Sequence, residues 1–316
     1  ADGIEFVTDI HYESVQVVKN ASGWSPQNPC HSAEFPDMVV NVKDKKTGAP
    51  RAISCKAILV ATGRKPNVEG LGLEAAGVDY DLRSGVQVND LLQTTNPNIY
   101  AVGDVCSKYQ FTHVSGTHAQ MVVQNAFFGG KERVSEMVVP WCTYTEPEVA
   151  HVGVYAHELE ARGEECDTYT ANFGHLDRAI LEGATDGFVR VHCKKGSEKI
   201  IGATIVAPCA GEMISELTVA IQFNVPLGRT GLGGVIHSYP TLSEAVAGCA
   251  FQCKMKAWEK VVTNDSNTKL KVAYPAERLL VPPRTTAGGL GRFFGVGFCV
   301  GAGVGALFSF LLLRSV

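Results

Sequence analysis

The sequence predicts an α/β fold for the first part of the chain, an α+β fold for the second part, and one C-terminal transmembrane helix. Three observations carry this prediction. Two apolar segments, at residues 57–61 and 99–102, each end close to a glycine, as strands buried on both faces of a sheet do. Between residues 137 and 258, predicted strands are followed by segregated helices, which is typical of α+β domains. A run without charged residues fills positions 293–313.

Composition excludes several classes of protein. The 316 residues carry a formal net charge of −4, with 45% hydrophobic and 19% charged residues. Intrinsic disorder requires low hydrophobicity and high net charge, so it is excluded. The negative net charge argues against nucleic acid as a partner bound through bulk positive charge. Ten cysteines are too few for a disulfide scaffold, and the lack of a CxxC spacing gives no indication of a structural metal site.

Short strands separated by turns are predicted over the first 135 residues. They are expected at residues 5–10, 12–18, 38–43 and 52–60. The last of these overlaps the wholly apolar segment 57–61, which we expect to be a buried strand. In a nucleotide-binding α/β sheet, ligands lie beyond the carboxyl ends of such strands.

The second part of the chain predicts a different architecture, with strands flanked by helices. Strands are expected at residues 139–144, 188–193 and 199–206. Helices are expected at residues 156–162, 210–223 and 241–258.

Residues 291–314 are predicted to form a single membrane-spanning helix. The uncharged run of 21 residues within them would extend about 32 Å as a helix, close to the ~30 Å hydrocarbon core of a bilayer. Residues 263–290 contain three prolines and no apolar periodicity, and predict a linker. More arginines precede the run than follow it, which places the large N-terminal part on the cytoplasm-like side of an unidentified membrane. The alternative is a glycine-rich tail that is disordered or removed by cleavage.

Two short motifs point to a nucleotide ligand. Gly63 follows the apolar segment 57–61 in a tight turn, where the absence of a side chain lets a phosphate or adenosine group approach the backbone. Asp104 follows Gly103 at the end of the second apolar segment, and its carboxylate can accept hydrogen bonds from ligand hydroxyls. Each motif alone also fits a turn glycine with a capping aspartate. Their order, about forty residues apart, favours the nucleotide interpretation.

Four motifs resemble the class I pyridine nucleotide–disulfide oxidoreductases, a family that includes dihydrolipoamide dehydrogenase, glutathione reductase and mercuric reductase. They are ATGRKPN at 61–67, NIYAVGDV at 98–105, YTEPEVAHVG at 144–153 and HSYPTLSEA at 237–245. The resemblance implies FAD and NAD(P)H as cofactors and a homodimer. It also implies a partial FAD/NAD(P)-binding Rossmann-type domain followed by an α+β dimerisation domain.

The resemblance assigns five residues to the flavin. Gly63 is implied to lie near the FAD diphosphate and adenosine, and Asp104 to bind the ribityl chain. A helix N-terminus at Phe111, Thr112 and His113 is implied to direct backbone amides at the pyrimidine edge of the flavin. The positive end of a helix dipole suits such a position, because it stabilises negative charge. We expect the ring of His113 to make no contact.

The HSYPTLSEA motif departs from the disulfide-reducing members, which carry His directly before Pro-Thr and an orienting Glu five residues later. Glu244 is present, but Tyr239 stands in the histidine position, and a phenol with a pKa near 10 is a poor base at neutral pH. On an extended segment, His237 would point the same way as Tyr239, two residues later, and it is a candidate substitute base. Mercuric reductase resembles this pattern in having Tyr there, which favours a mercuric-reductase-like branch, although the C-terminal vicinal cysteines of that enzyme are missing here.

The GxGxxG units and the CxxxxC redox disulfide of this family are absent from the sequence, so we expect a fragment without the N-terminal half. We predict that residues 1–136 are the C-terminal part of the FAD/NAD(P)-binding region and residues 137–262 the dimerisation domain, with Tyr239 and Glu244 reaching the active site of the partner subunit. The predicted function is an oxidoreductase that uses NAD(P)H to reduce FAD, and then a disulfide, a metal ion or a related small-molecule acceptor. The alternative is a membrane-tethered, non-catalytic flavin-binding or dimerisation module.

Overall fold

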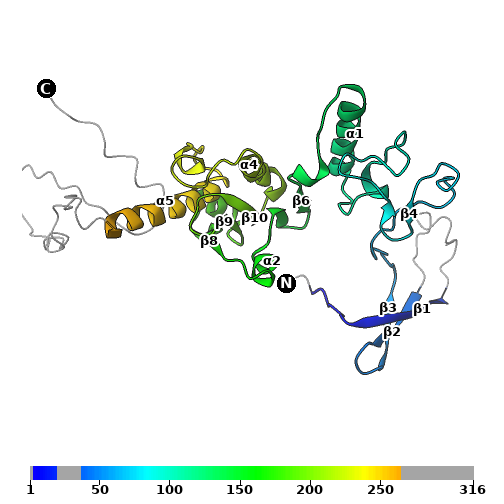
Figure 1. Cartoon of the computed structure of the whole chain (residues 1–316). Helices are drawn as coiled ribbons and strands as arrows, with labels where there is room; N and C mark the ends of the chain where they lie inside the picture. Colours follow the sequence, from blue (N-terminus) through cyan, green and yellow to red (C-terminus); the bar gives the residue numbers. More distant parts are fainter. Residues whose placement is uncertain (1–2, 20–36, 265–316) are drawn as a thin grey trace, which may run out of the picture. The chain divides into compact units, whose positions relative to one another are not determined.

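The computed structural model describes residues 3–19 and 37–264 of the chain. The chain divides between Lys65 and Pro66 into two compact units, which are treated separately below (Figure 1). The domain limits predicted at residues 136 and 262 stay predictions.

The first unit is a three-stranded antiparallel sheet. Its strands are β1 (Ile10–Lys19), β2 (Asp37–Asp44) and β3 (Pro50–Cys55), in the order β1-β2-β3. The β2–β3 turn is shaped by Asp44, whose Oδ1 accepts hydrogen bonds from the backbone N–H groups of Lys46 and Thr47 at 2.9 and 2.7 Å. The strands predicted at 12–18 and 38–43 are therefore confirmed, whereas residues 5–9 are not part of a strand.

The buried strand predicted at residues 57–61 is wrong. These residues have no regular secondary structure, and Leu59 and Val60 are 92% and 76% exposed. A strand needs neighbouring strands to satisfy its backbone hydrogen-bonding groups. Within the described part of the chain, no segment pairs with residues 57–61.

The second apolar segment, residues 99–102, forms local pairs in place of a buried strand. The Ala101 N–H donates to the Leu92 carbonyl at 3.1 Å, and the Thr94 N–H donates to the Ile99 carbonyl at 2.9 Å. All strand pairs among the described residues are antiparallel. The two apolar segments consequently do not form the buried strands of an α/β sheet in that part of the chain.

The second unit begins with short elements around a small core of Val68, Val78, Val86 and Ala101. In chain order they are β4 (Tyr80–Asp81), β5 (Gly85–Val86), the 3-10 helix η2 (Gly103–Val105), α1 (Thr112–Phe127) and the 3-10 helix η3 (Val134–Glu136). The start of α1 confirms the helix N-terminus predicted at residues 111–113.

A five-stranded antiparallel sheet follows, with the strand order β6-β7-β10-β9-β8. Its strands are β6 (Pro140–Thr143), β7 (Glu148–Gly153), β8 (Cys166–Asn172), β9 (Phe188–Lys194) and β10 (Ile200–Ala207). The accompanying helices are α2 (Ala156–Ala161), η4 (Phe173–His175), α3 (Asp177–Glu182), α4 (Ala210–Gln222), η5 (Leu232–Gly234) and α5 (Glu244–Asn264). This arrangement confirms the predicted α+β architecture.

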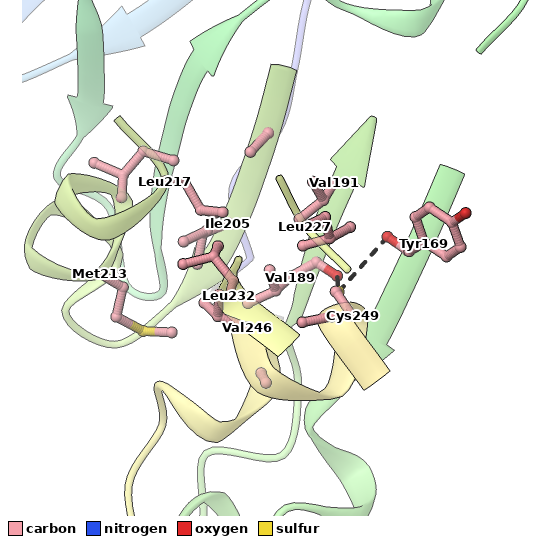
Figure 2. Close-up of a cluster of buried hydrophobic side chains, with 14 of the residues drawn as sticks. Tyr169, Val189, Val191, Ile205, Met213, Leu217, Leu227, Leu232, Val246 and Cys249 are labelled. Carbon is pink, nitrogen blue, oxygen red and sulfur yellow. Dashed lines mark hydrogen bonds between the residues drawn. The ribbon is translucent and has the colours of Figure 1, made fainter. Parts of the chain in front are cut away.

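The main core lies between one face of this sheet and helices α4 and α5 (Figure 2). Strand residues such as Val189, Val191 and Ile205 are fully buried there, because alternate strand residues point to one face. Cys249 on α5 packs among them, and its thiol donates to the Val189 carbonyl at 3.4 Å. Burial raises the pKa of this thiol to about 12, so Cys249 is a structural residue and not a redox group.

The predicted membrane span at residues 291–314, and all but the first two residues of the predicted linker, lie outside the described residues. Within the described residues, no helix has the length and apolar character needed to cross a bilayer.

Candidate functional site

The turn formed by Gly103 and Asp104 packs directly against the first turn of α1. Gly103 has a φ of +72°, and a Cβ atom at this position would lie only 2.5 Å from Ser115 Oγ. Glycine is required on both counts, because other residues rarely adopt this φ and their side chain would collide with the helix. The Ser115 hydroxyl lies 3.5 Å from Asp104 Oδ1 and donates to it. The structure thus places the Asp104 carboxylate beside the N-terminal end of α1. The sequence predicted Asp104 and this helix start separately, but not the contact through Ser115.

His118 supports the turn from within α1. This residue is 1% exposed, and its Nδ1 accepts a hydrogen bond from the Gly103 backbone N–H at 3.2 Å. Because Nδ1 is the acceptor, the ring proton lies on Nε2, which is buried and has no hydrogen-bond partner among the described residues. Burial lowers the pKa of His118, which keeps the ring neutral at pH 7.

The N-terminal end of α1 has no side-chain cap. Phe111 is the N-cap residue, with extended backbone angles, and it makes no side-chain capping hydrogen bond. The first N–H groups of a helix have no partner within the helix. Thr112 and His113 therefore present backbone donors at the point where Asp104 presents an acceptor.

The expectation that the His113 ring makes no contact is wrong. Its ring stacks on that of Phe111, with centroids 5.2 Å apart, and its Nε2 donates to the Pro140 carbonyl at 2.9 Å. The chain returns to the start of α1 as β6 begins, and so provides this acceptor. The side chain of His113 consequently braces the helix terminus, while its backbone N–H stays at the helix start.

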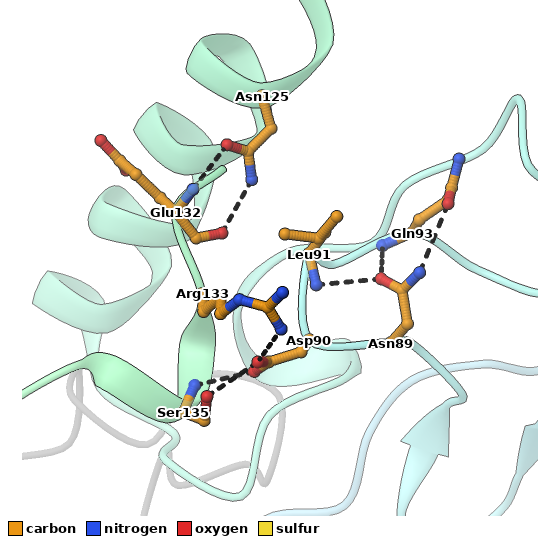
Figure 3. A network of polar contacts seen from close by, with 8 residues as sticks. All are labelled: Asn89, Asp90, Leu91, Gln93, Asn125, Glu132, Arg133 and Ser135. Carbon is orange, nitrogen blue, oxygen red and sulfur yellow. Dashed lines mark hydrogen bonds and ion pairs between the residues drawn. The ribbon is translucent and has the colours of Figure 1, made fainter. Parts of the chain in front are cut away.

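A polar network fixes the opposite end of α1 (Figure 3). Asn125 makes two hydrogen bonds with the backbone of Glu132, each 2.9 Å long. Asp90 accepts hydrogen bonds from the Ser135 hydroxyl and N–H at 2.7 and 2.8 Å, and an ion pair with Arg133 at 3.3 Å adds to them. The bonds from Ser135, with that from Arg133, lower the pKa of the Asp90 carboxyl. Residues 132–135 thereby connect the end of α1 to the loop at residues 89–93.

Gly63 belongs to the first unit, whereas Asp104 and α1 belong to the second. Its φ of +102° lies in the range that glycine favours, and no atom lies within 4 Å of the position that a Cβ would take. Among the described residues, the space beside the Gly63 backbone is therefore open, and the predicted contact with a ligand stays a prediction.

Tyr239 lies in an exposed loop ahead of α5. Its side chain is 63% exposed, and its hydroxyl donates to Asp177 Oδ2 at 2.6 Å. This hydrogen bond raises the pKa of the phenol above its ordinary value. The phenol is therefore protonated at neutral pH, and its O–H is directed at Asp177.

The other two predicted catalytic residues, His237 and Glu244, make their hydrogen bonds elsewhere. His237 Nε2 lies 2.9 Å from Glu216 Oε1 on α4, while His237 Nδ1 is buried without a hydrogen-bond partner in the described structure. Glu244 accepts a hydrogen bond from the Thr241 N–H at 3.1 Å, so its carboxylate serves the start of α5. The carboxylate that contacts the Tyr239 hydroxyl is that of Asp177.

Sequence reasoning missed four residues of these two clusters: Ser115, His118, Asp177 and Glu216. The two carboxylates lie 62 and 21 positions from the side chains that they contact, so no local spacing could have indicated them. Ser115 and His118 stand three residues apart on one helix, which puts them on one face. The predicted start of that helix was the signal in the sequence that could have indicated these two residues.

Two family models match consecutive parts of this chain. The model described as pyridine nucleotide-disulphide oxidoreductase matches residues 2–125, and the dimerisation domain of the same family matches residues 139–250. The chain belongs to the pyridine nucleotide-disulphide oxidoreductase family. Members of this family use FAD and NAD(P)H, as the sequence predicted.

The similarity to individual relatives extends over part of this chain and part of each relative. Mitochondrial dihydrolipoyl dehydrogenase of Sus scrofa is 35% identical over 206 residues, which are 65% of this chain and 40% of that enzyme. The human enzyme is 34% identical over the same length and also has 40% of its chain covered. The chain therefore spans less than half the length of these curated relatives.

Two solved structures show the same fold. The Cu(II) complex of RclA, an HOCl-induced flavoprotein disulfide reductase from Escherichia coli, has a TM-score of 0.64 at 23% identity, with 77% of this chain and 50% of RclA covered. LpdA from Mycobacterium tuberculosis has a TM-score of 0.61 at 26% identity, with 68% and 46% covered. The fold of this family, a Rossmann-like redox domain with a dimerisation domain, is thus shown.

The residues at the start of α1 fit the flavin that the family uses. A Cβ at Gly103 would fill the space between the turn and the helix. The Asp104 carboxylate supplies an acceptor for hydroxyl groups, and the uncapped helix start supplies N–H donors. These are the donor and acceptor types that a ribityl chain and a flavin carbonyl edge require.

Proposed function

We propose that this chain is part of a flavoprotein that uses NAD(P)H to reduce FAD and then reduces a disulfide, a metal ion or a related small-molecule acceptor. The observation that carries the proposal is the Gly103-Asp104 turn held against the uncapped start of α1. Family membership supports it. Among the matched proteins, one is called a dihydrolipoyl dehydrogenase and another a flavoprotein disulfide reductase.

In this proposal, the residues of the chain bind and orient the flavin. The Asp104 carboxylate accepts hydrogen bonds from the ribityl hydroxyls, and the N–H groups of Thr112 and His113 donate to the pyrimidine edge. Gly63 leaves room for the diphosphate. FAD, when bound, would accept a hydride from NAD(P)H and pass two electrons to the acceptor. With a disulfide as acceptor, NAD(P)H and one proton yield NAD(P)⁺, and the disulfide becomes two thiols.

On the acceptor side, the geometry favours Tyr239 over His237 as the group that meets the substrate. Tyr239 is exposed, and its hydroxyl is protonated and donates to Asp177. The ring nitrogens of His237 are bonded to Glu216 or buried, so His237 holds the loop on α4. A protonated phenol can donate a proton to a reduced acceptor. This supports the mercuric-reductase-like branch over the usual histidine relay, although the sequence lacks the vicinal cysteines of that enzyme.

We further propose that the protein acts as a homodimer through residues 137–262, anchored by residues 291–314, with the catalytic part on the cytoplasm-like side. The match to a dimerisation domain supports the first point, and the uncharged run of the sequence supports the second. A second candidate function is a membrane-tethered, non-catalytic flavin-binding module. Tyr239 in the histidine position and the lack of a CxxxxC motif in the sequence favour it.

The test uses the longer flavoprotein that contains this chain, purified and assayed for bound flavin by its visible absorbance. Oxidation of NADH and NADPH is then followed with a small disulfide, a Hg(II) salt and ferricyanide. We expect one flavin per chain and turnover with at least one acceptor. Flavin without turnover would support the module, whereas a colourless protein would refute both functions.

A matched pair of variants ties the result to the site. Asp104→Ala should abolish stoichiometric flavin, because it removes the acceptor of the ribityl hydroxyls. Asp186→Ala changes an exposed aspartate in the loop before β9, and this variant should retain stoichiometric flavin. Equal flavin in both variants would remove Asp104 from the proposal.

A further inference from the structure

The buried ring of His118 has no role in the function proposed above, yet it contacts the backbone of the flavin-binding turn. His118 and Ser115 lie three residues apart on α1, so they share one face of the helix. Ser115 reaches the Asp104 carboxylate, and His118 Nδ1 accepts from the Gly103 N–H at 3.2 Å. The turn is therefore held at two points, one on its side chain and one on its backbone.

The hydrogen bond at Gly103 depends on one tautomer of the ring. A backbone N–H can only donate, so His118 Nδ1 must be unprotonated. The ring is fully enclosed, since His118 is 1% exposed, and water cannot replace Nδ1 as the acceptor. Without it, the Gly103 N–H would be a buried donor with no partner, which proteins rarely tolerate.

The position of Asp104 follows from this contact. Gly103 immediately precedes Asp104, and the Cys106 and Ser107 N–H groups both donate to the Gly103 carbonyl, at 3.1 and 3.0 Å. A rotation of the peptide at Gly103 would therefore shift the whole of η2, including the aspartate.

We propose that His118 is a positioning residue of the flavin site, which holds the Gly103-Asp104 turn in its ligand-binding conformation through Nδ1. The inference rests on the proposed flavin binding, and it assigns to His118 a role that acts through Asp104 and not by contact with the reacting atoms. What matters in this role is an acceptor at the Nδ1 position, not the aromatic ring as such.

Three substitutions in the longer flavoprotein separate the acceptor from the ring. Asn places its Oδ1 on the same carbon as His Nδ1, so His118→Asn keeps the acceptor. His118→Gln carries its polar atoms one bond further out, and His118→Leu has none. His175→Leu, at an exposed histidine in η4, serves as the matched control.

The readout is the dissociation constant of FAD, measured by flavin fluorescence on protein stripped of flavin and titrated back. We expect an increase of about tenfold for His118→Leu and for His118→Gln, which is ~1.4 kcal/mol and in the range of one buried hydrogen bond. His118→Asn and His175→Leu should stay within about twofold of the unmodified protein, since the Gly103 N–H retains its acceptor in both. Far-UV circular dichroism shows whether each variant is folded.

Two results would overturn the inference. Unchanged FAD affinity in His118→Gln and His118→Leu would show that the turn does not need the acceptor. Loss of affinity in His118→Asn equal to that in His118→Gln would show that ring packing, not Nδ1, matters, and this pair decides the question even if His118→Leu does not fold. A wild-type protein without FAD would instead refute the proposed function itself.

Discussion

Replacement of Gly103 by alanine should remove the flavin while the fold persists. The backbone there has a φ of +72°, and the new methyl group would meet Ser115 Oγ at 2.5 Å and Ser115 Cβ at 2.9 Å. A left-handed conformation costs a non-glycine residue ~1–2 kcal/mol, and an overpacked contact costs ~1–3 kcal/mol more. The turn can escape both costs only by moving away from α1, which displaces Asp104. Together they amount to about 2–5 kcal/mol against the ligand-binding turn, so we expect the FAD dissociation constant to rise at least roughly 30-fold.

The matched control is Gly129→Ala, just beyond the C-terminal end of α1. Gly129 has a φ of +66°, close to that of Gly103, but no atom lies within 4 Å of its Cβ position. It therefore incurs the conformational cost without the collision, and it lies at the far end of the helix from Asp104. FAD affinity is measured by fluorescence titration and stability by thermal unfolding of the longer flavoprotein.

The two variants should differ in flavin affinity and resemble each other in melting temperature to within a few degrees. If Gly103→Ala binds FAD as tightly as Gly129→Ala, the close approach of the turn to Ser115 has no part in flavin binding. If both variants lose FAD equally, backbone strain alone accounts for the effect, and the packing argument is wrong.

Three further predictions concern other parts of the chain. Tyr239→His should raise disulfide-reductase activity in the longer flavoprotein, since imidazole can act as a base at neutral pH; no change in that assay would place Tyr239 off the acceptor path. Asp167→Asn should lower the melting temperature at pH 7 by about 2–6 °C. Burial raises the pKa of the Asp167 carboxyl, but hydrogen bonds from the Gly196 N–H at 2.9 Å and Lys256 Nζ at 3.0 Å outweigh burial and lower this pKa. A lowered carboxyl pKa stabilises the fold fully above the unfolded value of about 3.9, so this difference should shrink below about pH 4 and vanish once the pH is below the lowered pKa of the folded protein; a gap of unchanged size in acid would contradict the assignment. Removal of residues 291–316 should release the protein from membranes, and unchanged fractionation would refute the anchor.

The parts of the fold that the sequence predicted well are those whose partners are also in the described chain. Helices α4 and α5 and the strands β9 and β10 show clear apolar patterns, and each finds its neighbour within the same sheet and core. The segment 57–61 has an equally clear pattern, but it lacks a neighbouring strand among the described residues and stays irregular. Apolar pattern reports what a segment would bury, whereas a strand also requires a partner for its backbone.

In the candidate site, too, the residues that could be predicted differ from those that could not in where their partners lie. Gly103 and Asp104 were predictable because their chemistry follows from a local motif. The carboxylates of Asp177 and Glu216 were not, since each meets its partner only after the chain has folded back over many residues. His118 gave no signal of its own, because a single histidine inside a helix has the same spacing whether it packs in a core or supports a ligand-binding turn.

The polar network beside α1 involves a loop, residues 89–93, that also bonds to the chain close to the Gly103-Asp104 turn. Helix α1 has 16 residues and is thus about 24 Å long, with Asn125 near its C-terminal end and the Gly103-Asp104 turn against its first turn. The loop at residues 89–93 also contacts the chain just before this turn, because the Leu92 carbonyl accepts the Ala101 N–H at 3.1 Å. Asp90 of the same loop holds Ser135, in the segment that follows α1. One short loop therefore supports both the approach to the Gly103-Asp104 turn and the segment that returns along the helix.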